Sequence, residues 1–146
     1  MNNEMKEVIF DNKQLQEKCA EWQRILRLQD WIVDIGISRS RDMNLDNAQA
    51  EIVPCLPKRM ATVRILDSVD YPPDCAEPQD MELSLVHELL HIHLFPLFAD
   101  REDEMRLIAE EQAIEAISRG LIYLYRKGGE QNADSNDLRG DGGAEE

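Results

Sequence analysis

The segment from Asp80 to Phe95 constrains the fold more than any other part of the sequence. Its apolar residues occur all round a helical wheel instead of forming one stripe. Such a helix is stable only when neighbouring elements cover every side, so we expect this segment to lie in the middle of the protein. Pro96 follows at once and predicts an end or a kink of the helix, because proline lacks a backbone N–H and clashes with the preceding helical turn.

Elements that could cover this helix precede it in the chain. Apolar residues spaced three and four apart predict an amphipathic helix from about Asp11 to Asp30, capped by Asp11 or Asn12. Apolar and polar residues then alternate, which is typical of strands with one buried face. The alternation predicts three short strands, at residues 31–37, 48–52 and 60–66, and Pro54 and Pro57 are expected to stop the second one.

A long helix is expected after the buried one, from Asp100 or Arg101 to Tyr125. Acidic residues occupy its first turns and basic residues its last, an order that complements the helix dipole. Gly128 and Gly129 are expected to stop this helix, because glycine is the usual residue just beyond a helix end.

The order of elements predicts an α+β fold. An N-terminal helix, a small and mainly antiparallel sheet of three strands, the buried helix and the long C-terminal helix follow one another, with the last two helices on one face of the sheet. The strand at 60–66 is expected at the edge of the sheet. Beyond Gly129 the sequence is polar, acidic and almost without apolar residues. We therefore expect one compact domain over residues 1–127 and a disordered tail over 128–146.

Composition narrows the range of partners. The 146 residues carry 30 acidic against 16 basic side chains, and the formal charge of −14 would repel the phosphates of a nucleic acid. No apolar run reaches the roughly 18 residues of a transmembrane helix, and the N-terminus lacks the basic start and apolar stretch of a secretory signal. The 3 cysteines have no CxxC spacing and do not indicate a disulfide framework. We expect a cytoplasmic protein without nucleic-acid or membrane partners.

All three histidines lie inside the buried helix, within the sequence His87-Glu-Leu-Leu-His91-Ile-His93. His87 and His91 are one turn apart on the same face, where two imidazole nitrogens can reach one metal ion at about 2.0–2.1 Å. Glu88 lies beside this face, where its carboxylate can accept a proton from metal-bound water. His93 points to another side of the helix and is not expected to be a ligand. Left unpaired, such polar groups would each cost about 1–3 kcal/mol, which a bound cation would remove.

A catalytic zinc ion needs a third protein ligand, and the long helix offers two candidates. Glu111 is the favoured ligand, and Glu110 is the competitor because the apolar stripe of the helix passes between the two residues. Glu115 comes one turn after Glu111, so it could form a hydrogen bond to a ligand histidine. The sequence therefore predicts a Zn²⁺ site made by His87, His91 and Glu111, with Glu115 behind it.

The histidine motif, followed by Glu111 and Glu115, resembles the gluzincin arrangement of thermolysin-type metallopeptidases. Residues 10–126 as a whole are similar to small phage-type and bacterial metallopeptidases of the minigluzincin class. The resemblance implies a zincin-like fold and zinc-dependent hydrolysis of peptide bonds, in which a metal-activated water attacks and Glu88 is the general base. The implied partner is a peptide or protein substrate, and the sequence indicates no particular oligomeric state.

Two other hypotheses differ from the peptidase in what they require of the metal. In the first, the chain is a non-catalytic interaction module of phage or bacterial origin that zinc stabilises, which requires a closed site of four ligands. In the second, weaker one, the chain is a metal-free acidic protein that mimics nucleic acid. Metal content and peptidase activity together separate the three hypotheses.

Overall fold

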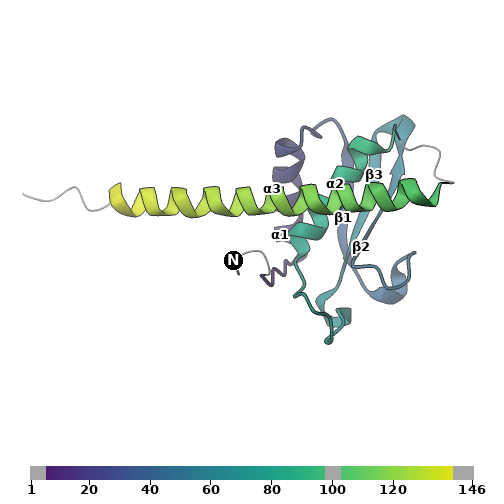
Figure 1. The fold of residues 1–146 in the computed structure, drawn as a ribbon, viewed down its shortest axis with the longest axis horizontal. Coiled ribbons are helices and arrows are strands. Elements are labelled where there is room, and N and C mark those ends of the chain that lie inside the picture. The colour runs from purple at the N-terminus through teal and green to yellow at the C-terminus, as the bar shows by residue number, and fades with distance from the viewer. Residues whose placement is uncertain (1–5, 98–102, 140–146) are drawn as a thin grey trace, which may run out of the picture.

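Three α-helices and one three-stranded sheet make up the computed structural model, which describes residues 6–97 and 103–139, with side chains as far as Gln131 (Figure 1). The arrangement confirms the predicted α+β class, with the sheet preceded by one helix and followed by two. The elements follow in the order α1 (Asn12–Ile25), β1 (Ile32–Ser38), β2 (Ala50–Cys55), β3 (Met60–Leu66), α2 (Met81–Leu94) and α3 (Glu104–Arg139).

Helix α1 begins at a capping box, and a residue with a positive φ follows its C-terminal end. The Asp11 carboxylate accepts a hydrogen bond from the Gln14 backbone N–H at 2.8 Å, and the Gln14 side chain accepts one from the Asp11 backbone at 3.0 Å. Asp11 is thus one of the two predicted caps. The helix ends at Ile25, earlier than expected, because Arg27 has a φ of 61° and turns the chain toward β1.

The sheet is mixed, with the strand order β1-β3-β2. The predicted antiparallel pairing holds for β2 and β3, whereas β1 runs parallel to β3. Only residues 56–59 separate β2 from β3, which allows an antiparallel hairpin. The connection from β1 to β3 contains the whole of β2 and is long enough for parallel pairing.

Two expectations about the strands are wrong. β3 is the central strand and not an edge, because it pairs with β1 on one side and β2 on the other. β2 is not stopped by Pro54 but continues to Cys55. Proline is tolerated there because β2 is an edge strand, where a missing backbone donor need not break a pairing.

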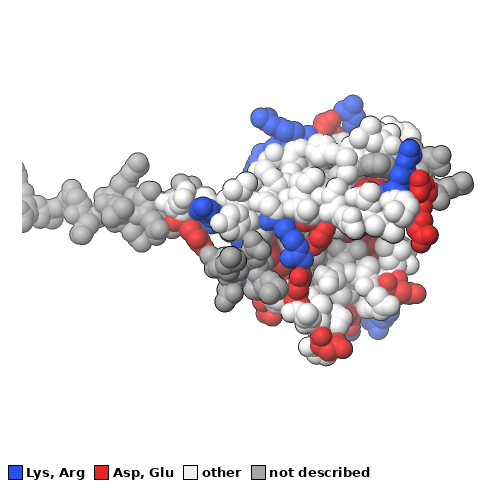
Figure 2. Space-filling view, viewed as in Figure 1, with Lys and Arg blue, Asp and Glu red and all other residues white. Residues whose placement is uncertain are grey.

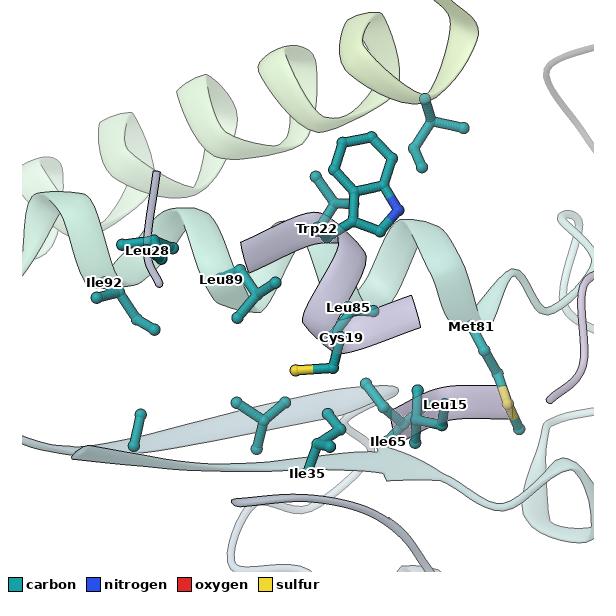
Figure 3. Packing of buried hydrophobic residues seen from close by; sticks show 14 of the residues in the cluster. Leu15, Cys19, Trp22, Leu28, Ile35, Ile65, Met81, Leu85, Leu89 and Ile92 are labelled. Carbon is teal, nitrogen blue, oxygen red and sulfur yellow. The ribbon is translucent and has the colours of Figure 1, made fainter. Parts of the chain in front are cut away.

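The core lies between the sheet and helices α1 and α2 (Figure 3). Ile35 of β1 and Ile65 of β3 point toward Leu15 of α1, and α2 lies above them with Leu85 and Leu89 facing inward. Ile65, Leu85 and Leu89 are 0% exposed. Since α1, α3 and the sheet all contact α2, this helix is central, as its all-round apolar character predicts.

Helix α3 does not stop at Gly128 and Gly129, so the predicted end of this helix is wrong. Both glycines continue the helix, and neither has a positive φ. A glycine in a helix costs only about 1 kcal/mol relative to alanine, so the pair weakens the helix without ending it. No helix among the described residues has the length and apolarity needed to cross a membrane.

Parts of the predicted C-terminal region lie outside the described residues. These parts are the expected helix start at Asp100 or Arg101 and the end of the predicted tail, residues 140–146. The nearer part of that tail, as far as Arg139, belongs to α3 and projects beyond the other elements (Figure 1).

The two faces of α3 differ in character. Along the body of the molecule, Figure 2 shows mostly uncharged residues on its outer face, bordered by charged residues of both signs. The exposed fraction is 50% at Ile117 and 64% at Leu124. Four residues on the other face are buried and fix which side of α3 meets α2: Glu110, Ile114, Ser118 and Ile122.

A buried cluster of charged side chains holds α3 against α1 and α2. Arg126 of α3 donates to the Asp80 carboxylate at 3.0 Å and lies 3.4 Å from Glu82. Glu82 also accepts a hydrogen bond from Trp22 Nε1 at 3.1 Å and lies 3.2 Å from Lys18 Nζ. Asp80 and Glu82 are 9% and 4% exposed, so both carboxylates depend on these cations for stabilisation.

Replacing Arg126 with methionine is therefore expected to lower the free energy of unfolding by about 3 kcal/mol, because it leaves two buried carboxylates short of a cation. Denaturant unfolding at neutral pH measures this change. The matched control is Arg59→Met, which breaks an exposed pair of 2.6 Å with Asp30 and should cost less than about 1 kcal/mol. Equal losses in the two variants would show that the buried cluster does not stabilise the fold.

Candidate metal centre

Helix α2 presents two imidazoles to α3. His87 and His91 are one helical turn apart, and their ring centroids are 5.2 Å apart. His91 is 8% exposed and stacks on Phe95, whose ring centroid lies 5.9 Å away. Phe95 thus restricts the orientation of the His91 ring.

Glu111 of α3 lies opposite both imidazoles. Its two carboxylate oxygens lie 3.1 Å from His87 Nε2 and 3.0 Å from His91 Nε2. One ligand atom from each of the three residues lies within 4.8 Å of the other two. His87, His91 and Glu111 could therefore hold a metal ion, and they are the three residues that the sequence predicts for this role.

Two further carboxylates of α3 lie behind the imidazoles. Glu115 is 2.8 Å from His87 Nδ1, the position predicted for it. Glu110 is 2.9 Å from His91 Nδ1 and only 3% exposed. Its place behind His91 was not predicted from the sequence, where Glu110 was a competing ligand. The sequence feature that could have indicated this role is the position of Glu110 beside the apolar stripe, because a glutamate buried there needs a polar partner.

The hydrogen-bonding capacity of the imidazoles fits a bound cation. A neutral imidazole has one N–H donor and one acceptor nitrogen. Both rings have a carboxylate oxygen at each nitrogen, so in the neutral form one nitrogen of each ring faces an oxygen that also accepts. A metal ion between the two Nε2 atoms and Glu111 removes this mismatch, because Nδ1–H of His87 can then donate to Glu115 and Nδ1–H of His91 to Glu110. Protonation of both nitrogens of each ring is the alternative.

Glu88 is a buried carboxylate beside the three candidate ligands. It is 7% exposed, and within the described part of the chain its carboxylate makes no hydrogen bond. The pKa of Glu88 is raised to about 7, mainly by burial and further by the nearby carboxylates of Glu111 and Glu51, while the charge of His87 acts in the opposite direction. A glutamate in this environment can exchange a proton near neutral pH.

In the metal-free protein, this pKa makes folding stability depend on pH. The native state holds the Glu88 proton up to about pH 7, whereas the unfolded chain releases it near the ordinary value of 4.5. The stabilising contribution is therefore complete below 4.5 and is lost as the pH rises through 7. Glu88→Gln is expected to be about 3 kcal/mol more stable than the wild type at about pH 8, and about equally stable near pH 4.

Unfolding in a chelating buffer at the two pH values tests this expectation. Glu17→Gln removes the same charge from an exposed position of α1 and is the control, with a change below about 0.5 kcal/mol at both pH values. If Glu88→Gln stabilised the protein equally at both pH values, the effect would not come from ionisation of Glu88.

A pocket of about 560 Å³ opens beside the candidate ligands. Helix α2 contributes His87 and Glu88 to its wall, and α3 contributes Glu111. The other walls come from β2 with the residues before it and from the loop at 71–78. The candidate metal centre therefore faces a space large enough for part of a substrate.

Three other polar side chains, those of His93, Tyr71 and Tyr125, lie outside the lining of this pocket. His93 Nε2 is 2.7 Å from the Leu26 carbonyl, which places its ring toward the end of α1, as its position on α2 predicts. Tyr71 donates to the Glu77 carbonyl at 2.6 Å, and Tyr125 to Glu21 at 2.6 Å. These three side chains do not line the pocket.

Comparison with known proteins gives no match among family models, curated proteins or solved structures.

Proposed function

We propose that this chain is a zinc-dependent metallopeptidase in which His87, His91 and Glu111 hold the ion. The observation that carries the proposal is the convergence of three ligand groups at the wall of a pocket that also contains the buried Glu88. A structural zinc site uses four protein ligands, whereas a catalytic one leaves a position for water or substrate. Three ligand groups facing an open pocket therefore favour a catalytic site, in agreement with the resemblance to gluzincins.

The donor atoms suit zinc better than the hard divalent cations. Two imidazole nitrogens and one carboxylate oxygen form a common catalytic zinc site, while magnesium and calcium prefer oxygen donors throughout. When bound, zinc would lower the pKa of a water ligand to about 7 and polarise a substrate carbonyl. The carboxylates of Glu110 and Glu115 would orient the two imidazoles and keep them basic.

Glu88 is the residue proposed to move the proton. Its carboxylate lies in the pocket wall next to His87, so it can take the proton of the attacking water and later deliver it to the leaving amine. The positive charge of a bound ion would favour the ionised form that this role requires.

The free edge of β2 is the proposed binding surface for an extended peptide. Among the residues that the structure describes, β2 pairs with β3 and with no other strand, and Ala50, Glu51 and Ile52 line the pocket. A peptide could add as a strand along this edge, where backbone hydrogen bonds bind it independently of its sequence. This assignment replaces the strand at 60–66, which is central in the sheet.

The direct test of the proposal is metal content together with cleavage of a diverse peptide library by the purified protein. One zinc per chain with cleavage that a chelator abolishes is the expected result. One zinc per chain without cleavage would instead favour the zinc-stabilised interaction module. Absence of any bound metal would overturn both hypotheses.

A further inference from the structure

Arg119 of α3 connects the candidate metal centre with the loop at 71–78. Its Nε donates to Glu115 Oε1 at 2.9 Å, and its Nη2 donates to Glu77 Oε2 at 2.7 Å. The other oxygen of Glu115 lies 2.8 Å from His87 Nδ1. A continuous chain of charged hydrogen bonds therefore runs from Glu77 through Arg119 and Glu115 to His87.

Each side chain in this series of hydrogen bonds is oriented by its neighbours. The side chain of Glu115 is 41% exposed, so the bond to His87 alone would have to hold a carboxylate that water also solvates. The planar guanidinium of Arg119 fixes the second oxygen and thereby the orientation of the carboxylate. Glu77 is held twice, since Arg119 binds its side chain and Tyr71 donates to its backbone carbonyl at 2.6 Å.

We infer that Arg119 is a positioning residue that orients His87 through Glu115 and couples metal binding to the position of the loop at 71–78. This inference rests on the proposed metal centre. Glu77 and Pro78 form part of the pocket wall, so the coupling links the metal to the shape of the pocket. Arg119 already binds two carboxylates, which makes it a tether and not a free group for an anionic substrate.

Long-range charge and positioning predict opposite effects of removing Arg119. Loss of a positive charge near the centre should by itself attract a divalent cation more strongly. Loss of the tether should weaken binding, because residues that orient metal ligands are typically worth 10- to 100-fold in metal affinity. The sign of the change in zinc affinity therefore separates the two effects.

The test compares zinc affinity in Arg119→Met, Arg119→Lys and Arg106→Met, measured by competition with a chelating dye. Arg119→Met is expected to bind zinc about tenfold more weakly than the wild type, and Arg119→Lys is expected to recover part of the loss. Arg106 is exposed on the same helix and makes no hydrogen bond or ion pair among the described residues, so Arg106→Met controls for the change in charge.

Hydrogen exchange supplies a readout that a purely local ion pair would not change. Zinc is expected to slow exchange of the backbone amides at 71–79 in the wild type, and this protection should disappear in Arg119→Met. Unchanged or tighter zinc binding by Arg119→Met, or protection that persists, would overturn the inference while leaving the metal centre intact. A wild type that binds no zinc would overturn the metal centre itself and the inference with it.

Discussion

Replacing Glu88 with glutamine is expected to lower kcat/KM for peptide hydrolysis by about 10²- to 10⁴-fold while the protein still binds one zinc per chain. Glutamine has nearly the same size and fits the same buried position, but it cannot accept the proton of the attacking water. The measurement is cleavage of a fluorogenic peptide by wild type and variant, each with its zinc content determined.

The outcome for zinc decides how the loss of activity is interpreted. Glu17→Gln, on the exposed face of α1, should retain both activity and zinc. If Glu88→Gln lost its zinc together with its activity, Glu88 would be a metal ligand and not the base. If the variant kept wild-type activity, the proposed role of Glu88 would be wrong.

Replacing His91 with alanine is expected to weaken zinc binding by more than about 100-fold. Loss of a residue that only forms a hydrogen bond to a metal ligand costs at most about 100-fold, and loss of the ligand itself should cost more. His91 supplies one of the three candidate ligand atoms, and no other side chain of the described residues lies in position to replace it. Isothermal titration or dye competition measures the affinity.

Two further variants serve as comparisons for the zinc affinity of His91→Ala. Glu110→Gln keeps an acceptor behind His91 Nδ1 but removes its charge, so a loss of about 10- to 100-fold is expected. His93→Ala removes an imidazole from the same helix that binds the Leu26 carbonyl, and zinc affinity should not change. Equal losses in the His91 and His93 variants would mean that the zinc is not bound where we propose.

The part of the site on α2 could be predicted from the sequence because one helix carries it. A spacing of four residues places His87 and His91 on the same face whatever the rest of the fold does. The burial of α2 follows equally directly from its all-round apolar character. Local periodicity is sufficient for both conclusions.

The choice between Glu110 and Glu111 could not be made in that way. Neighbouring residues on a helix point about 100° apart, so the choice depends on how α3 is rotated against α2. That rotation is fixed by packing of residues such as Ile114 and Ser118, both 0% exposed, against the rest of the fold. The structure places both glutamates around His91, one at each ring nitrogen.

Strand order and the length of α3 also depend on interactions beyond local sequence. The alternation in Met60–Leu66 predicts a strand with one buried face but does not state how many neighbours it has, and the structure gives it two. Gly128 and Gly129 lower helix propensity, yet the helix before them is held by Arg126 and Tyr125, and it continues through the glycines.

The most direct test of the central claim is the position of zinc in crystals, from anomalous differences measured at the zinc absorption edge. We expect one peak between α2 and α3, about 2.0–2.2 Å from His87 Nε2, His91 Nε2 and an oxygen of Glu111. A peak elsewhere, or no peak at this crossing in crystals grown with excess zinc, would contradict the claim.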